Sequence, residues 1–218
     1  MSVMPREEVL AQQVKLADAN FRLLKESNVR AFNIMGPAGS GKTTVIEKLI
    51  ERLIYCDLSV GTVATAQSGD TDHQRFVTCG AQSVNVDLGE QAYLDALALS
   101  RALSDFDLNA IDVLLVENVP GIISMLDFPL GTTEEIAVLP LTAGNAVIQS
   151  YPRIFSQTDL LVINKVDLQS IVNIDPEMLA TEYARINPQG RIIRTDARRG
   201  NGIDDLVKEL GYTCEGRW

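Results

Sequence analysis

The fold of this chain is decided by residues 36–43, Gly36-Pro37-Ala38-Gly39-Ser40-Gly41-Lys42-Thr43, which match the pattern G-x-x-x-x-G-K-[S/T] at every fixed position. The apolar run at residues 31–35 leads into this stretch and predicts a strand. The residues after it recur at helical spacing and predict a helix: Val45, Ile46, Leu49, Ile50, Leu53 and Ile54. A strand, a glycine-rich loop and a helix in this order are the setting that a phosphate-binding loop requires. The sequence therefore predicts that the chain binds a nucleoside triphosphate.

Each type of residue in this loop has a role in holding phosphates. The glycines let backbone N–H groups turn toward the β-phosphate, and the positive end of the helix dipole adds to the attraction. Lys42 is expected to reach the β- and γ-oxygens as a mobile charge, and the Thr43 hydroxyl to bind Mg²⁺. We expect nucleotide contacts from the whole loop and the residue after it: Gly36, Pro37, Ala38, Gly39, Ser40, Gly41, Lys42, Thr43 and Thr44.

Apolar segments of strand length alternate with helical patterns along the rest of the chain. Strands are predicted at residues 31–35, 59–65, 83–88, 112–117, 136–141, 159–163 and 191–195, and helices at residues 5–25, 45–54, 92–103, 175–186 and 202–210. Residues 66–73 and 118–133 are predicted to be loops. The alternation is typical of an α/β protein with a doubly wound, mostly parallel sheet and helices on both faces, as in P-loop NTPases. We expect an N-terminal helical extension at residues 1–28 and one P-loop domain at residues 29–218.

Composition excludes several classes of function. A formal net charge of −10 opposes binding to nucleic acid and to anionic membranes, because both attract basic proteins. Cys56, Cys79 and Cys214 are scattered and form no C-x-x-C pair, so neither a disulfide nor a local zinc site is expected. The chain shows no signal-peptide pattern and no apolar run of membrane-spanning length. We therefore expect a cytoplasmic protein.

The predicted N-terminal helix carries one apolar stripe, formed by Leu10, Val14, Ala17, Phe21 and Leu24. Two heptads are too few for a free coiled coil. The stripe either packs on the helix's own domain or also meets a partner subunit, and the sequence leaves both open.

Two further motifs follow predicted strands. Glu117 ends the strand at residues 112–117, and an acid at that end of a parallel strand, beside the phosphate loop, can hold Mg²⁺ through water. Asn164-Lys165-Val166-Asp167 follows the strand at residues 159–163 and has the N-K-x-D pattern of guanine-binding GTPases. The Asp167 carboxylate can accept from both guanine N1–H and the exocyclic amine, a pair of donors that adenine lacks.

The other residues expected around the base follow from the same placement. Lys165 is expected to lie along the base plane, and Asn164 to link this loop to the phosphate loop. Thr195-Asp196-Ala197 follows the last predicted strand, where such proteins usually carry Ser-Ala-Lys. At this place the Ala197 N–H is expected to contact guanine O6, with Asp196 beside it and Arg198 above the ring.

With both motifs placed, residues 16–210 resemble the nickel-incorporation GTPases of hydrogenase maturation, the HypB family, whose near cousin is the urease accessory GTPase. The resemblance rests on the two nucleotide motifs and on Asn20, Asn33, Glu117-Asn118-Val119, Tyr151-Pro152 and Gly200-Asn201-Gly202. It implies a cytoplasmic protein that binds GTP with Mg²⁺, dimerises in response to GTP, hydrolyses GTP slowly and helps to deliver nickel to a metalloenzyme precursor.

The chain departs from this family at the shared metal site. The family's Cys-His pair falls on Ala92 and Tyr93, and its loop cysteine falls on Ser124. Methyl, phenol and hydroxyl groups do not replace the thiolate and imidazole ligands of nickel and zinc. We therefore expect no nickel or zinc at that place.

Two more departures concern the reaction. The family's Mg²⁺-facing Asp after the second strand falls on Ala66 without a gap or on Asp70 with one, and we adopt Asp70. The glycine that senses the γ-phosphate is shifted by one place, to Gly121 after Pro120. No arginine finger can be assigned.

The main hypothesis is a slow GTPase of the HypB type that hydrolyses GTP to GDP and phosphate and thereby gates a homodimer in metallocentre maturation. Lys42, Thr43, Asp70 and Glu117 would carry the reaction, and Thr43, Asp70 and Glu117 would hold Mg²⁺. An alternative is a GTP-responsive dimeric scaffold that has lost metal handling and efficient hydrolysis. A small-molecule kinase would explain the phosphate loop but would leave the N-K-x-D motif without a role.

Overall fold

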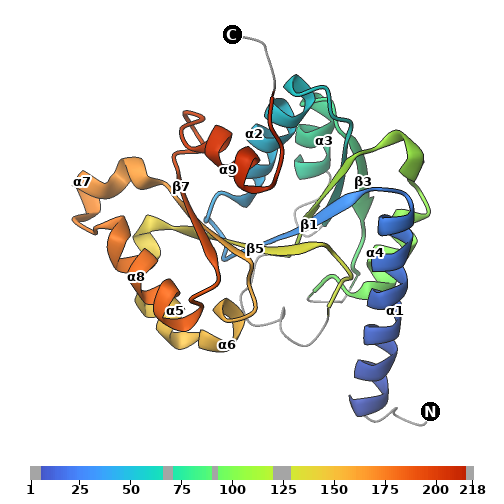
Figure 1. Ribbon diagram of the computed structural model, residues 1–218, viewed down its shortest axis with the longest axis horizontal. Coiled ribbons are helices and arrows are strands. Elements are labelled where there is room, and N and C mark those ends of the chain that lie inside the picture. Colours follow the sequence, from blue (N-terminus) through green and yellow to red (C-terminus); the bar gives the residue numbers. More distant parts are fainter. Residues whose placement is uncertain (1–5, 66–70, 90–92, 120–128, 215–218) are drawn as a thin grey trace.

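The computed structural model describes residues 6–65, 71–89, 93–119 and 129–214, without the side chains of residues 6, 7 and 9. Within these residues seven strands form one sheet in the order β3-β2-β4-β1-β5-β6-β7, and all neighbouring strands are parallel (Figure 1). The strands are β1 (Arg30–Met35), β2 (Val60–Thr65), β3 (Gln82–Val86), β4 (Val113–Glu117), β5 (Glu134–Pro140), β6 (Leu160–Asn164) and β7 (Arg191–Thr195). All seven strands predicted from the sequence are present.

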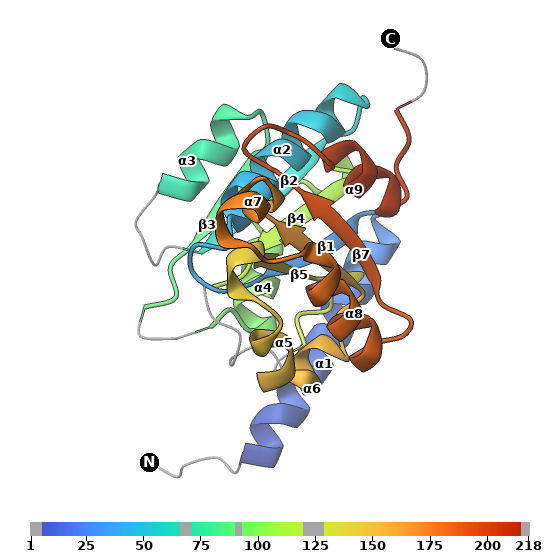
Figure 2. The same ribbon diagram turned by 90° about the vertical axis from the view of Figure 1, so that its left-hand side faces the viewer.

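Helices cover both faces of this sheet (Figure 2). One face carries α2 (Lys42–Tyr55), α3 (Thr71–Thr78) and α9 (Ile203–Glu209). The other carries α1 (Arg6–Glu26), α4 (Ala96–Leu103), α5 (Ala146–Ser150), α6 (Pro152–Phe155) and α8 (Pro176–Ile186), and α7 (Gln169–Val172) follows β6. The predicted doubly wound α/β fold is confirmed. None of the helices in the described ranges combines the length and hydrophobicity that crossing a bilayer requires.

Side chains of the central strands alternate between two apolar layers. In β6, Leu160 and Val162 pack in the cluster that contains the α2 and α9 residues, whereas Leu161 and Ile163 pack with Leu179 of α8. Every residue of β4 and β6 is buried. Burial on both faces explains why these strands read as continuous apolar runs in the sequence.

The end of α2 is joined to the end of the described chain. Cys56, the C-cap of α2, forms a disulfide with Cys214, and their Cα atoms are 4.7 Å apart. The expectation of no disulfide was therefore wrong. The two cysteines are 158 residues apart in sequence, and only the return of the chain after α9 brings them together.

Several predicted element boundaries were also wrong. Residues 71–73 do not belong to a loop, because α3 begins at Thr71 and anchors itself through the buried Phe76. The helix predicted at residues 92–103 begins only at Ala96, since the Asp95 side chain accepts from the Ala98 N–H and caps the helix there. The short helices α5, α6 and α7 were not predicted.

Helix α1 packs on its own domain through a face that matches the expected one only in part. Its buried residues are Gln13, Ala17, Asn20 and Leu24, whereas Val14 is 47% and Phe21 42% exposed. Val14 and Phe21 of the predicted stripe therefore do not form the buried face.

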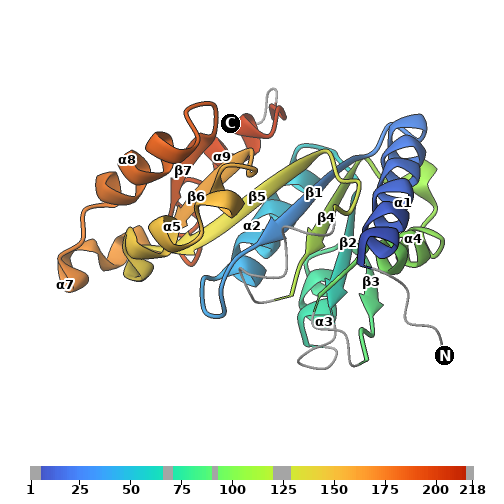
Figure 3. The ribbon, with the colours of Figure 1, turned by 90° about the horizontal axis from the view of Figure 1, so that it is seen from below.

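Amide side chains fasten this helix to its neighbours. Gln13 donates to Asp95 and accepts from the Ala96 N–H, at 2.8 and 3.0 Å. Asn20 donates to the carbonyls of Ala96 and Leu130, at 2.9 and 3.0 Å. These bonds hold α1 beside α4 (Figure 3). Because Val14 and Phe21 of the stripe are exposed, contact between this helix and a partner subunit is still open.

Asn20→Ala is expected to lower the free energy of unfolding by about 2 kcal/mol, because two buried carbonyls lose their amide donor. Phe21→Glu, at the next position, is expected to cost about 1 kcal/mol or less, since this side chain is partly exposed. Urea unfolding followed by circular dichroism measures both. A larger loss for Phe21→Glu would show that the apolar stripe, and not the buried amides, holds α1 in place.

Candidate nucleotide site

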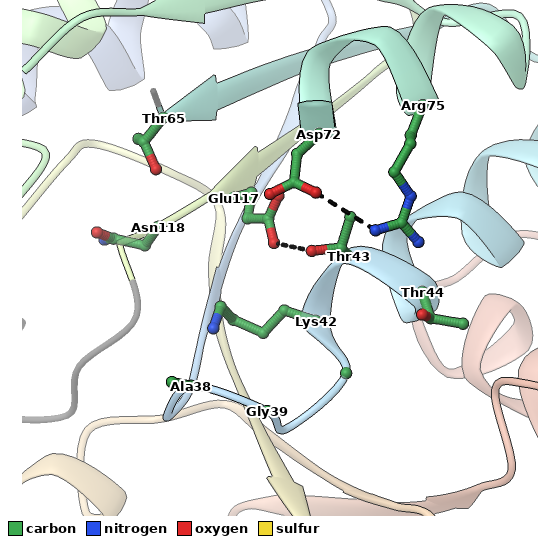
Figure 4. A pocket seen from close by; sticks show the side chains of 11 residues that line it. Ala38, Gly39, Lys42, Thr43, Thr44, Thr65, Asp72, Arg75, Glu117 and Asn118 are labelled. Carbon is green, nitrogen blue, oxygen red and sulfur yellow. Dashed lines mark hydrogen bonds and ion pairs between the residues drawn. The ribbon is translucent and has the colours of Figure 1, made fainter. Parts of the chain in front are cut away.

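Two adjoining cavities lie at the carboxyl ends of the central strands. The first, of about 550 Å³, is the phosphate cavity and is lined by Lys42, Thr43, Asp72, Arg75, Glu117 and Asn118, among others (Figure 4). The second, of about 400 Å³, is the base cavity and is lined by Asn164, Lys165, Asp167, Asp196, Ala197 and Arg198, among others. Gly39, Gly41 and Thr44 line both cavities. The structure thus brings the phosphate loop and the N-K-x-D motif together around two cavities that share lining residues.

The phosphate loop is tightly packed at two glycines. A Cβ on Gly36 would lie 2.2 Å from the Val138 carbonyl oxygen, and one on Gly41 would lie 2.5 Å from Asn164 Nδ2. Gly41 also has a φ of 90°, in the left-handed region. Both positions therefore require glycine, and the second of them lets the Asn164 side chain approach the loop.

The Lys42 ammonium lies over this loop. Lys42 Nζ donates to the carbonyl oxygens of Gly36 at 2.9 Å and Pro37 at 3.4 Å, and the residue is buried. Burial lowers the pKa of Lys42, while the negative charges of Glu117 and Asp72 act in the opposite direction. A cation that is poorly solvated and faces the phosphate cavity is suited to bind phosphate oxygens.

An oxygen-rich cluster stands beside Lys42. The Thr43 hydroxyl donates to Glu117 Oε1 at 2.7 Å, and Asp72 lies next to Glu117 (Figure 4). The pKa of Glu117 is raised to about 7, mainly by burial and also by the charge of Asp72, against the hydrogen bond from Thr43 and the charge of Lys42, which lower it. One hydroxyl and two carboxylates are ligands that Mg²⁺ prefers, so these residues fit a magnesium ion.

The structure describes neither Asp70 nor Ala66, the two sequence candidates for the Mg²⁺-facing position, so that choice lies outside the described residues. Asp72 was not expected from the sequence. It comes from the first turn of α3, which had been predicted as a loop. Because no helix was predicted here, there was no reason in the sequence to place Asp72 in the site.

Arg75 is a second residue that the sequence reasoning missed. Its Nε and one terminal nitrogen donate to the two Glu47 carboxylate oxygens at 2.8 and 2.6 Å, and the other donates to Asp72 at 3.3 Å. These bonds join α3 to α2. The hydrogen bond to Glu47 is the main reason why the pKa of Arg75 is raised. The i, i+3 spacing of Asp72 and Arg75 was the available signal that both side chains share one face of a helix.

Asn164 links the base cavity to the phosphate loop, as expected. Its Nδ2 donates to the Ser40 carbonyl at 2.9 Å, and its Oδ1 accepts from the Thr195 hydroxyl at 3.1 Å and from the Ala197 N–H at 3.2 Å. The Ala197 N–H, expected to contact guanine O6, is thus bonded to Asn164 in this structure. Its use by the base stays a prediction.

Charged side chains lie in and beside the rest of the base cavity. Lys165 has a left-handed backbone and donates to the Gly39 carbonyl at 2.7 Å. Arg199, which the sequence reasoning did not select, lies 2.9 Å from the buried Asp196 carboxylate and 3.5 Å from Asp167. The Asp196 hydrogen bond is the main cause of the raised pKa of Arg199. Arg199 balances two carboxylates that line the same cavity.

Comparison with known proteins agrees with this geometry. The nucleotide-binding domain of the CobW/HypB/UreG family matches residues 30–194. A probable hydrogenase maturation factor HypB from Methanocaldococcus jannaschii is 36% identical over 202 residues, which cover 93% of this chain and 91% of that protein. Hydrogenase maturation factor HypB from Escherichia coli is 29% identical over 217 residues, which cover 95% and 73%.

Solved structures give the same result. The crystal structure of hydrogenase maturation factor HypB from Archaeoglobus fulgidus matches with a TM-score of 0.85 and 34% identity, over 92% of this chain and 98% of that one. HypB from Helicobacter pylori, in complex with nickel, shares the fold with a TM-score of 0.84 and 21% identity, over 95% and 100%. This chain therefore belongs to the CobW/HypB/UreG family of nucleotide-binding domains, and hydrogenase maturation factors HypB are among its homologues.

Proposed function

We propose that this protein is a GTPase of the HypB type, which hydrolyses GTP to GDP and phosphate in the maturation of a nickel enzyme such as a hydrogenase. One observation carries the proposal: the phosphate cavity and the N-K-x-D base cavity adjoin at Gly39, Gly41 and Thr44. A single guanine nucleotide fits this arrangement, with its base by Asp167 and its phosphates by Lys42. The family membership and the HypB homologues support the same role.

The phosphate chemistry follows from the charges in the phosphate cavity. The loop N–H groups and Lys42 bind the β- and γ-oxygens and stabilise negative charge that develops between them. Thr43 and Glu117 are the residues that would hold Mg²⁺, and a bound magnesium ion would supply further positive charge to the phosphates. Asp72 is the third candidate ligand because it lies beside Glu117, and Asp70, just before α3, is the alternative from the sequence.

The proposed rate of hydrolysis is slow. Arg75 is the only arginine among the described residues that line the phosphate cavity, and its guanidinium is bonded to Glu47 and Asp72. An arginine held by two carboxylates is not available to stabilise the transferring phosphoryl group. This observation also favours the second candidate function, a GTP-responsive dimeric scaffold with negligible hydrolysis.

The proposed assembly is a GTP-dependent homodimer that acts in the cytoplasm on a metalloenzyme precursor or accessory protein. The half-exposed Val14 and Phe21 of α1 offer apolar surface for such a contact. Of the three positions that correspond to the family's metal ligands, Ala92 and Ser124 lie outside the described residues. Tyr93 keeps a phenol where the family has a ligating side chain.

Lys42→Ala is expected to lower phosphate release from GTP at least 100-fold, because the cavity loses its phosphate-binding cation. Lys48→Ala, on the same helix, is the matched control, since Lys48 pairs with Glu51 on the surface and is expected to leave the rate unchanged. Phosphate release under single-turnover conditions measures both. Equal rates for Lys42→Ala and the unmodified protein would refute the GTPase assignment, whereas nucleotide-driven dimerisation without any release would favour the scaffold.

Asp167→Asn is expected to reduce the preference for GTP over ATP by two orders of magnitude, about 3 kcal/mol, because an amide donor would then face a guanine donor. Competition binding with a fluorescent nucleotide gives the ratio. Asp175→Asn makes the same exchange at the N-cap of α8 and is expected to keep the preference. A motif that does not read the base would leave the GTP/ATP ratio of Asp167→Asn unchanged.

Nickel titration, with and without a GTP analogue, is expected to detect no stoichiometric site tighter than about micromolar, since Ala92, Tyr93 and Ser124 offer no soft ligands. Cys79 and His73 are the nearest alternatives. The pKa of the Cys79 thiol is raised, mainly by burial and then by the charges of Glu47 and Glu51. His73 Nδ1 shares a hydrogen bond with Ser83. The raised pKa of Cys79 disfavours the thiolate that would bind nickel. Tight binding of one nickel ion per dimer would overturn the expectation, and Cys79→Ser would show whether that thiol is responsible.

A further inference from the structure

A chain of polar side chains crosses the sheet next to the phosphate cavity. Asn118, which lines the cavity, donates through Nδ2 to Asn33 Oδ1 at 3.1 Å. Asn33 Nδ2 in turn donates to Glu135 Oε2 at 2.5 Å, and the Thr132 hydroxyl donates to Glu135 Oε1 at 2.7 Å. Asn33 and Glu135 are register partners on the parallel strands β1 and β5. Neither of them lines the nucleotide cavities.

The Glu135 carboxylate at one end and the Val119 N–H at the other set the direction of the bonds in this chain. An ionised Glu135 only accepts hydrogen bonds, so Asn33 has to turn its NH₂ toward Glu135 and its oxygen toward Asn118. Asn118 then has to turn its NH₂ toward Asn33, which leaves its oxygen to accept from the Val119 N–H at 2.8 Å. Burial raises the pKa of Glu135, and the hydrogen bonds from Thr132 and Asn33 oppose the rise by stabilising the charged form.

Asn118 lies at the end of the phosphate cavity that is farther from the base. Gly39, Gly41 and Thr44 line both cavities and therefore mark the side on which a nucleotide enters the phosphate cavity. Figure 4 shows Asn118 and Thr65 across Lys42 from Thr44, with Glu117 beside them. A nucleotide that runs from the base cavity past Lys42 brings its terminal phosphate to this end.

We propose that Glu135 is a positioning residue for the terminal phosphate. Through Asn33 it holds the Asn118 side chain, which also accepts from the Val119 N–H, in one orientation at the far end of the phosphate cavity. This inference rests on the proposed function, because it assumes a triphosphate that spans both cavities. It adds to that function a residue, outside both cavities, that lets the site distinguish a nucleoside triphosphate from a diphosphate.

The test compares the affinities of a non-hydrolysable GTP analogue and of GDP, both with Mg²⁺, by fluorescent-nucleotide titration. Glu135→Ala leaves the Asn33 amide free to turn over, so Asn118 Nδ2 loses its fixed acceptor and the Asn118 side chain is held by the Val119 N–H alone. The affinity ratio of analogue to GDP should therefore fall about tenfold, with GDP binding unchanged. Glu135→Gln should keep the ratio within about twofold, because its amide oxygen can accept from Asn33 while its NH₂ donates to the Thr132 hydroxyl.

Glu134→Ala is the matched control on the same strand. Glu134 pairs with Arg30 and Arg191, away from the cavities, so this variant should lose stability and keep the ratio. If Glu135→Ala does not fold, Asn33→Ala breaks the same link from the other side and carries the same expectation.

An unchanged ratio in Glu135→Ala, an equal fall in Glu134→Ala or a failure of Glu135→Gln to restore the ratio would each overturn the proposal. Failure of this inference can be distinguished from failure of the proposed function. A protein that preferred adenine nucleotides would refute guanine selection, yet the same ratio measured with an ATP analogue and ADP would still test Glu135.

Discussion

The nucleotide site depends on the side-chain amide of Asn164. Its nitrogen donates to the Ser40 carbonyl in the phosphate loop, and its oxygen accepts from Thr195 and from the Ala197 N–H after β7. Three segments that are far apart in sequence are thereby fixed to one planar group. The absence of a Cβ at Gly41 is what allows this close approach. Any side chain at position 41 would collide with this amide and push it away from the phosphate loop.

The parallel sheet makes such a joint possible. Because all strands run in one direction, the residues that follow β1, β4, β6 and β7 emerge at the same edge, and these segments supply most of the groups that line the cavities. The chain of amides from Asn118 to Glu135 adds a connection across the strands rather than along the edge. Polar side chains in the middle of a buried sheet are costly unless each is bonded, and here Asn33 uses both its amide nitrogen and its amide oxygen.

The sequence predicted those features whose residues are close together along the chain. The phosphate loop, the N-K-x-D motif and the seven strands each lie within a short segment, so spacing and periodicity were sufficient to find them. Arg75 pairs with Glu47 and Arg199 with Asp167, partners that only tertiary folding brings near, and no local pattern marks these two pairs. On α1, apolar periodicity predicted the buried positions Ala17 and Leu24 but missed Gln13 and Asn20, because these are polar residues that bond to the start of α4. Hydrophobicity alone does not reveal a polar side chain that is buried with its partners.

The disulfide between Cys56 and Cys214 turns most of the molecule into a covalent ring. Strands β2 to β7 and the N-K-x-D motif lie between these two residues in sequence, whereas β1, the phosphate loop and α2 precede Cys56. A protease that cuts one peptide bond anywhere inside the ring therefore releases no fragment while the bond between the sulfur atoms is intact. In a reducing compartment the same cut would split the protein into two separate chains. The fate of a nicked molecule is thus decided by the redox state of its surroundings.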